Sequence, residues 1–291
     1  MYWRALLLLI LGWFVTASST ADASVQVVAT IFPLADMVEQ IGGTEVEVAT
    51  LLPPGANPHT FEPNPSQVRA LARAQVLVEV GAGLDGWITK LRPAGSERLL
   101  TVTITAGVPL LSGSEVQESG GGDPHVWLDP LLVRDHIVPA IAAALIQADA
   151  AHRAAYEAAA VRYQSALTQL DADLRAAFAP LPQHTFITFH SAWTYFARRY
   201  GLEEAGVVER FPGKEPSAQE IAALVQKARA AQVRALLIEP QFGSRLAQQI
   251  ATEFGGHVVT VDPLGGPGIA GRNHYLDLMR YNLAMFVKAL Q

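Results

Sequence analysis

The sequence contains no cysteine among its 291 residues. This absence excludes disulfide bonds, thiolate metal sites, iron–sulfur clusters, cysteine nucleophiles and lipid attachment through cysteine. A metal site in this chain therefore has to be built from His, Asp and Glu side chains.

Charged residues are also scarce, at 16%, and the chain has no basic run. The net charge of −6 argues against nucleic acid as the main partner. Half of the residues are apolar, which is too large a fraction for an intrinsically disordered chain. The length allows one large domain or two of ordinary size.

Residues 1–23 have the pattern of a secretory signal peptide. Arg4 gives a positive start, Ala5–Val15 is an 11-residue apolar run, and Ala21–Ala23 is a cleavage site of the small-x-small type. Eleven helical residues span about 16 Å, too little to cross an apolar membrane core of about 30 Å. We expect no later segment long and apolar enough to cross a bilayer. The sequence thus predicts a periplasmic protein with a cleaved signal peptide and no lipid anchor.

Strand-like and helix-like segments alternate on both sides of one long helical stretch. Residues 150–179 contain neither Gly nor Pro and are rich in alanine, the best helix former, and Pro180 and Pro182 follow. The alternation predicts parallel sheets covered by helices. We predict an α/β fold of two similar lobes, each with a mainly parallel four-stranded sheet, joined by one long connector helix. The predicted parts are the signal peptide (1–23), an N-terminal lobe (24–149), the connector (150–180) and a C-terminal lobe (181–291).

Four polar residues follow predicted strands in the two lobes. In open α/β sheets, ligands bind beyond the carboxyl ends of the strands. The residues at these positions are His59, His125, His190 and Asp262. Three imidazoles and one carboxylate suit a tetrahedral site of the zinc type, and only a two-lobed fold could bring together residues so far apart in the chain.

The loops around two of these histidines are rich in proline. His59 lies in PPGANPHTFEPNP and His125 in DPHVWLDP. Proline fixes φ, so both loops are stiff, which lowers the entropy cost of assembling a site.

Five motifs together resemble one protein family. They are NPHTFEPNPSQVRAL, DPHVWLDP, FHSAWTYFARRYGL, IEPQFGSR and TVDPLGG, and they span the chain in this order. The chain resembles the zinc- and manganese-binding subunits of bacterial ABC importers, the TroA-like and ZnuA-type solute-binding proteins. The resemblance implies two lobes with the metal in the cleft between them, and His59, His125, His190 and Asp262 as its ligands. It also implies a membrane permease and a separate ATPase subunit as partners; we expect a monomer.

The resemblance points to zinc before manganese. Manganese-type members commonly have Glu where this chain has His190, and a third imidazole suits zinc, because manganese prefers oxygen donors. Many zinc-type members carry a His-rich acidic loop before the second ligand motif. Here Ser112–Asp123 is mildly acidic and contains no His, so a metal-scavenging role for this loop is in doubt.

Several other residues could belong to the site. Glu62 and Asp129 could orient imidazole N–H groups, although helix capping or exposure to solvent is an equal alternative, and Glu239 could orient an imidazole or act as a substitute ligand. The remaining histidines are expected to lie outside the site: His136, His152, His184, His257 and His274. The aromatic residues near the motifs are expected in the core: Trp127, Trp193, Tyr195 and Phe196.

Two other functions fit parts of the pattern. A secreted zinc hydrolase could also use three His and one Asp, but a catalytic zinc keeps an open position for water, and the chain has neither HExxH nor GxSxG. A metal-independent adhesin on the same fold is the other alternative. The absence of a GxxxxGK[ST] loop assigns ATP hydrolysis to another subunit.

Overall fold

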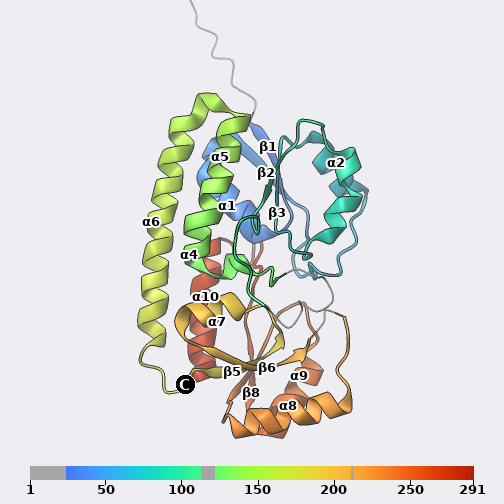
Figure 1. Cartoon of the computed structure of the whole chain (residues 1–291), viewed down its shortest axis with the longest axis vertical. Helices are drawn as coiled ribbons and strands as arrows, with labels where there is room; N and C mark the ends of the chain where they lie inside the picture. Colours follow the sequence, from blue (N-terminus) through green and yellow to red (C-terminus); the bar gives the residue numbers. More distant parts are fainter. Residues whose placement is uncertain (1–23, 113–121, 211–212) are drawn as a thin grey trace, which may run out of the picture.

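The computed structural model describes residues 24–291 except 113–121 and 211–212 (Figure 1). The predicted signal peptide and most of the Ser112–Asp123 loop therefore lie outside the described residues. The strands are β1 Val25–Ala29, β2 Val46–Thr50, β3 Val76–Glu79, β4 Leu100–Thr103, β5 Thr185–His190, β6 Glu203–Glu209, β7 Ala235–Ile238 and β8 His257–Thr260. The helices are α1 Phe32–Gly42, α2 Pro65–Arg73, α4 Pro130–Leu132, α5 Val138–Ala148, α6 Arg153–Phe178, α7 Thr194–Tyr200, α8 Ala218–Ala230, α9 Ser244–Phe254 and α10 Tyr275–Leu290.

The strands form two four-stranded sheets with the same topology. The first has the order β2-β1-β3-β4 and the second β6-β5-β7-β8, and every pair of neighbours is parallel. The prediction of an α/β fold with two similar lobes is confirmed. Because all four strands of a sheet run in the same direction, the loops after the strands of one lobe all emerge at the same edge.

Local sequence signals explain where several helices begin. Asn64 and Gln67 form a capping box at the start of α2, and Ser217 and Glu220 form one at the start of α8. The long helix begins slightly later than predicted. Asp149 accepts the N–H of Ala151, and residues 150–152 form a 3₁₀ turn before α6.

The helix α6 packs against both lobes. Its 26 residues run along one side of the molecule, against α1 and α5 of the N-terminal lobe and against α7 and α10 of the C-terminal lobe (Figure 1). Phe178 at the end of α6 contacts Phe196 of α7 and Phe286 of α10, with ring centroids 5.7 and 6.2 Å apart. One continuous apolar core extends from the first lobe along α6 into the second. The aromatic residues Trp127, Trp193, Tyr195 and Phe196 are buried, as expected.

The segment Pro130–Ala148 is the most apolar helical stretch in the described part of the chain. It consists of α4, a π-helical turn over Val133–Ile137 and α5, and Pro139, which has no N–H to donate, follows the widened turn. By length and composition alone it could cross a membrane, with a mean hydropathy of 1.4. The expectation that no later segment reaches this limit is therefore wrong. Ile141 and Leu145 are buried and the helix packs against α1 and α6, which is the arrangement of a core helix.

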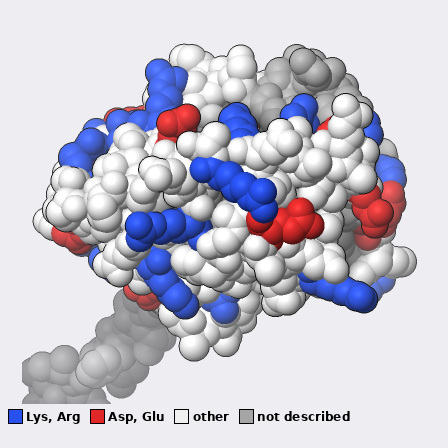
Figure 2. Space-filling model, turned by 90° about the horizontal axis from the view of Figure 1, so that it is seen from below, with Lys and Arg blue, Asp and Glu red and all other residues white. Residues whose placement is uncertain are grey.

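The two lobes differ in charge. Residues 24–180 carry nine Lys and Arg against 17 Asp and Glu, whereas residues 181–291 carry 11 against nine. Figure 2 shows the end of the molecule formed by the C-terminal lobe, where Lys and Arg side chains predominate. Arg229 and Arg234 donate to the backbone oxygens of Glu253 and Gln291 at the ends of α9 and α10, where helix carbonyls carry partial negative charge. Part of the excess of basic residues in the C-terminal lobe therefore stabilises the ends of helices.

Polar contacts also connect the lobes. Asp36 of α1 accepts hydrogen bonds from the backbone N–H of Tyr275 (2.8 Å) and from Nδ1 of His274 (2.9 Å), at the start of α10. Trp127 donates through Nε1 to the carbonyl of Pro263 (2.8 Å), and its own carbonyl accepts the hydroxyl of Tyr275 (2.7 Å). The first turn of α10 is thus capped by a carboxylate from the opposite lobe.

We predict that Asp36→Ala lowers the free energy of unfolding by about 2–4 kcal/mol, because it leaves the buried backbone N–H of Tyr275 without its charged acceptor and removes the partner of His274. Urea denaturation in the presence of a chelator measures the change. The control is Asp173→Ala, which removes an exposed carboxylate from α6 and should change stability by less than about 0.5 kcal/mol. Equal midpoints for the two variants would contradict the role assigned to Asp36.

The contact between Asp36 and His274 predicts that the stability of the protein depends on pH. The hydrogen bond to Asp36 raises the pKa of His274, and the negative charges of Asp36, Asp277 and Glu39 act in the same direction. A raised pKa in the folded state stabilises the protein fully below the ordinary imidazole value of about 6.5, and this stabilisation is lost as the pH rises through the raised value. We expect wild type to exceed His274→Gln in stability at pH 5.5 by more than at pH 9. A difference that does not vary with pH would exclude this ion pair as its source.

Candidate metal centre

His59 lies in the stiff loop between β2 and α2. Its backbone N–H donates to Oδ1 of Asn57 (2.9 Å), and the carbonyl of Pro58 accepts Nε1 of Trp87 (2.9 Å). On the far side of the loop, Gln67 of α2 donates to the carbonyl of Leu51 (3.1 Å) and so connects the two ends of the loop. These contacts, together with the prolines, hold the backbone at His59 in one position.

His125 lies between β4 and α4, where Asp123 holds both its backbone and its ring. Oδ1 of Asp123 accepts the backbone N–H of His125 at 2.9 Å and contacts Nδ1 at 2.8 Å. Both side chains are 2% exposed. A carboxylate on Nδ1 selects the tautomer with hydrogen on that atom, so Nε2 is the atom that would bind a cation.

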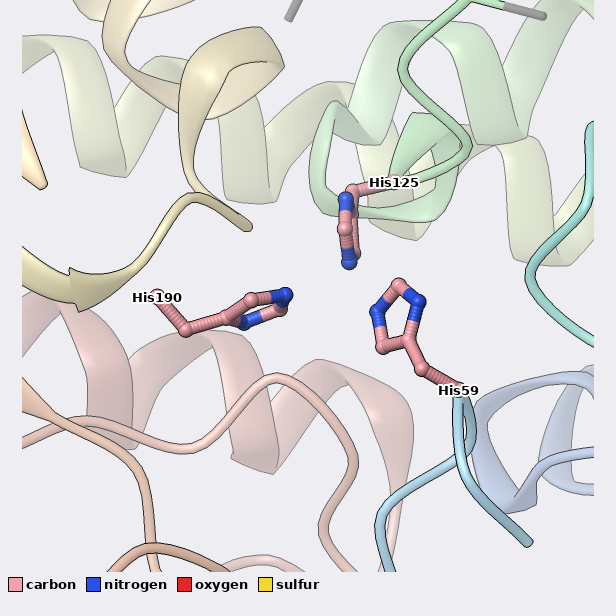
Figure 3. Close-up of side chains that lie close together, drawn as sticks. All are labelled: His59, His125 and His190. Atoms are coloured by element: carbon pink, nitrogen blue, oxygen red, sulfur yellow. The ribbon is translucent and has the colours of Figure 1, made fainter. Parts of the chain in front are cut away.

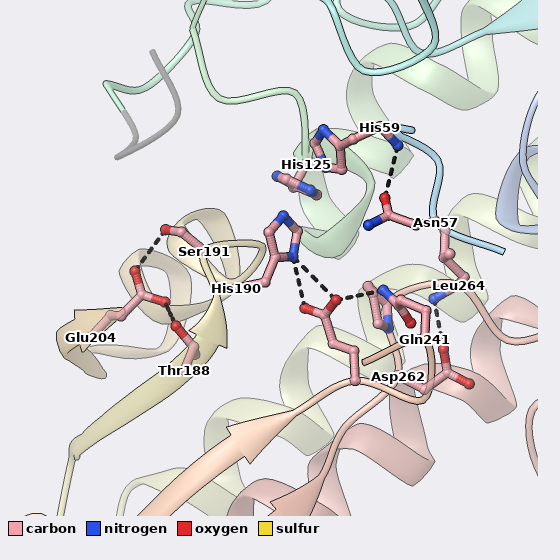
Figure 4. A network of polar contacts seen from close by, with 12 residues as sticks. Asn57, His59, His125, Thr188, His190, Ser191, Glu204, Gln241, Asp262 and Leu264 are labelled. Carbon is pink, nitrogen blue, oxygen red and sulfur yellow. Dashed lines mark hydrogen bonds and ion pairs between the residues drawn. The ribbon is translucent and has the colours of Figure 1, made fainter. Parts of the chain in front are cut away.

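His190 is the last residue of β5, and Glu239 follows the neighbouring strand β7. Nδ1 of His190 lies 3.1 Å from both carboxylate oxygens of Glu239, and Gln241 donates to the same carboxylate at 2.6 Å (Figure 4). Because β5 and β7 are adjacent, the pairing of the strands sets this contact. Glu239 therefore orients His190 in the way that Asp123 orients His125.

A second carboxylate, which is half-buried, supports the backbone around His190. Glu204 of β6 accepts hydrogen bonds from the hydroxyls of Thr188 (2.6 Å) and Ser191 (2.9 Å), on either side of the histidine (Figure 4). Burial raises the pKa of Glu204 to about 7, against the opposing effect of these two hydrogen bonds. Its contacts fasten the end of β5 to β6.

The three imidazoles point toward one another from three separate segments (Figure 3). The ring centroids are 5.6 Å apart for His59 and His125, 5.1 Å for His59 and His190, and 5.2 Å for His125 and His190. One nitrogen from each ring lies within 4.8 Å of the others. Around a tetrahedral Zn²⁺ with bonds of about 2.0–2.1 Å, ligand nitrogens lie about 3.4 Å apart, so a small approach of the rings suffices to coordinate one ion.

Asp262 is not part of this cluster in the described structure. It follows β8, and its Oδ1 accepts the backbone N–H groups of Leu264 (3.0 Å) and Gly265 (2.9 Å). Its Oδ2 accepts Nη1 of Arg272 at 2.9 Å. The structure thus places this carboxylate in a turn and an ion pair, and its role as a fourth ligand stays a prediction.

The other acidic candidates differ in their positions. Glu62 forms an exposed ion pair with Lys90 (2.9 Å). Asp129 caps α4 through the N–H of Leu131 and pairs with Arg199 of α7 at 2.6 Å, so it joins the lobes. Of the three acidic candidates, Glu239 contacts a histidine of the cluster.

Asp123 is the residue of this site that sequence reasoning missed. Its signal was present, because an Asp two residues before another residue commonly accepts that residue's N–H in an Asx turn. The remaining histidines lie outside the cluster, as expected: His136, His152, His184, His257 and His274.

The chain is similar to known metal-binding proteins. The family model described as "Zinc-uptake complex component A periplasmic" matches residues 27–289. The high-affinity zinc uptake system protein ZnuA of Bacillus subtilis is 28% identical over 282 residues, covering 92% of this chain and 88% of its own. The manganese-binding lipoprotein MntA of Halalkalibacterium halodurans is also 28% identical, covering 94% and 91%.

A solved structure supports the same assignment. The crystal structure of a ZnuA deletion mutant with zinc bound superposes with a TM-score of 0.82 at 32% identity, covering 92% of this chain and 98% of its own. The match of the family model spans nearly the whole described chain. The chain therefore belongs to the ZnuA family of periplasmic zinc-uptake components, which are zinc- and manganese-binding solute-binding proteins of ABC uptake systems.

Proposed function

We propose that this protein captures Zn²⁺ in the periplasm with His59, His125 and His190, and with Asp262 as the fourth ligand, and delivers the ion to the permease of an ABC importer. A separate ATPase subunit drives transport. The observation that carries the proposal is the convergence of three buried or half-buried imidazoles from three distant segments. Imidazole-rich sites favour zinc, and Mn²⁺ is the second candidate cargo.

The distribution of the ligands suggests how capture changes the protein. His59 and His125 belong to the N-terminal lobe, whereas His190 and Asp262 belong to the C-terminal lobe. An ion bound by all four joins the lobes and favours the conformation in which they are closest. Because α6 and the shared core support both lobes, the movement is a small tilt and not a wide hinge opening.

The contacts of the carboxylates in the site favour metal binding over catalysis. A hydrolytic zinc site needs an open coordination position and a general base beside it. Asp123 and Glu239 are both engaged with Nδ1 of a histidine, so they serve to orient ligands. On this proposal the protein acts as a carrier of the ion and not as an enzyme.

We predict that His59→Ala lowers the affinity for Zn²⁺ by more than about 100-fold, because loss of an orienting group alone costs about 10- to 100-fold in metal affinity. Competition against a chromophoric chelator measures the affinity. Elemental analysis of protein purified from its native periplasm identifies the metal, with one zinc per wild-type chain expected. His257→Ala removes an exposed histidine outside the cluster and should behave as wild type. Zinc retained by His59→Ala at full affinity would refute the proposed site.

We also predict that Asp123→Asn and Glu239→Gln each weaken Zn²⁺ binding by about 10- to 100-fold, since each removes the charge that orients a ligating imidazole. The same chelator competition measures both. Glu62→Gln is the matched control, because Glu62 is exposed and pairs with Lys90. If Glu62→Gln weakens binding as much as the other two, general surface charge and not imidazole orientation explains the effect.

A further inference from the structure

Asp262 is held by contacts that involve its two oxygens differently. Oδ1 accepts two backbone N–H groups, from Leu264 and Gly265, and these bonds build the turn that follows β8. Oδ2 has a different partner, the guanidinium of Arg272, ten residues further along the chain. The pair is largely shielded from solvent, with side-chain exposures of 22% for Arg272 and 5% for Asp262.

We propose that Arg272 competes with the bound metal for Oδ2 of Asp262 and thereby sets the metal affinity of the site. The inference rests on the proposed function, because it needs a metal at the three histidines. A guanidinium and a divalent cation on the same carboxylate oxygen repel each other, so Arg272 has to leave Oδ2 when the metal takes it. The free energy of the Asp262–Arg272 pair then opposes metal binding.

The position of Asp262 in the sheet makes this exchange possible. Asp262 follows β8 and His190 ends β5, so both lie at the carboxyl edge of one sheet with β7 between them. Glu239 follows β7 and contacts Nδ1 of His190, and Asp262 follows β8, the next strand along. The backbone bonds to Oδ1 can persist while Oδ2 changes partner.

Arg272 is anchored independently of Asp262. Its guanidinium stacks on the ring of Tyr281, 4.7 Å from the centroid, and cation–π contacts of this kind are favourable. Its backbone N–H donates to the carbonyl of Ile269 (2.9 Å) and its carbonyl accepts the N–H of Gly266 (3.1 Å). Breaking the ion pair therefore does not require the loop to unfold, and the arginine can remain on Tyr281.

A double-mutant cycle tests the competition, with Zn²⁺ itself as the probe and chelator competition as the readout. We expect Arg272→Gln to bind Zn²⁺ at least about tenfold more tightly than wild type, because a hydrogen bond between charged groups contributes about 1.5–3 kcal/mol. Asp262→Asn should bind more weakly than wild type, and adding Arg272→Gln to it should change nothing further. Arg280→Gln, which removes an exposed arginine from α10, is the control and should leave the affinity unchanged.

Two outcomes would overturn the inference. One is an affinity of Arg272→Gln equal to or lower than that of wild type; the other is an equal gain in the Asp262→Asn background. If Arg272→Gln does not fold, Arg272→Lys replaces it, because lysine keeps the charge but loses the planar fork, and a smaller gain in the same direction is expected. No gain would then overturn the inference.

A crystal structure of the zinc-loaded wild type gives an independent readout. We expect Oδ2 of Asp262 at about 2.0–2.2 Å from the ion, the usual distance for a zinc carboxylate. An Oδ2 still paired with Arg272 in the loaded protein would overturn the inference. If His59→Ala abolishes binding while Arg272→Gln has no effect, the proposed function stands and the competition alone fails. If wild type does not bind zinc, the proposed function itself fails.

Discussion

The arrangement of the two lobes depends on one apolar core that they share. The aromatic contacts among Phe178, Phe196 and Phe286 join α6 to the last helix and to the first helix of the second lobe. These contacts bury large rings, which contribute strongly to stability. Each sheet is consequently held with its carboxyl edge facing the other, and the loops that carry the histidines meet in the space between these edges.

The electrostatics of the site follow from two carboxylates that each contact an imidazole at Nδ1. Asp123 comes from a loop and Glu239 from the end of a strand, yet both present the opposite nitrogen of the ring to the centre. Such partners fix the tautomer and increase the basicity of the ligand. The site is therefore prepared for a cation before one arrives, which reduces the reorganisation that binding requires.

Much of the fold could be predicted from the sequence because its signals are local. The two capping boxes, the strand-and-helix alternation and the alanine-rich helix each depend on neighbouring residues. The three histidines could be predicted because they follow predicted strands. The contact between Glu239 and His190 could not be decided, because it depends on β5 and β7 being neighbours in the sheet.

The pairing of Asp262 with Arg272 could not be predicted from the sequence either. Ten residues of loop separate them, and only the folded turn brings the guanidinium to Oδ2. The apolar segment Pro130–Ala148 illustrates the same limit, since composition alone does not distinguish a core helix from one that crosses a membrane.

The hydroxyl of Tyr195, from the C-terminal lobe, contacts the backbone of Leu111 and of Asp123, two residues before His125. Tyr195 accepts the backbone N–H of Leu111 and donates to the carbonyl of Asp123, both at 3.0 Å, while the N–H of Asp123 bonds to the carbonyl of Leu111 at 2.8 Å. Leu111 and Asp123 are thus held together by this hydroxyl and by a backbone hydrogen bond. The position of His125, two residues after Asp123, therefore depends on a hydroxyl from the opposite lobe as well as on its own loop.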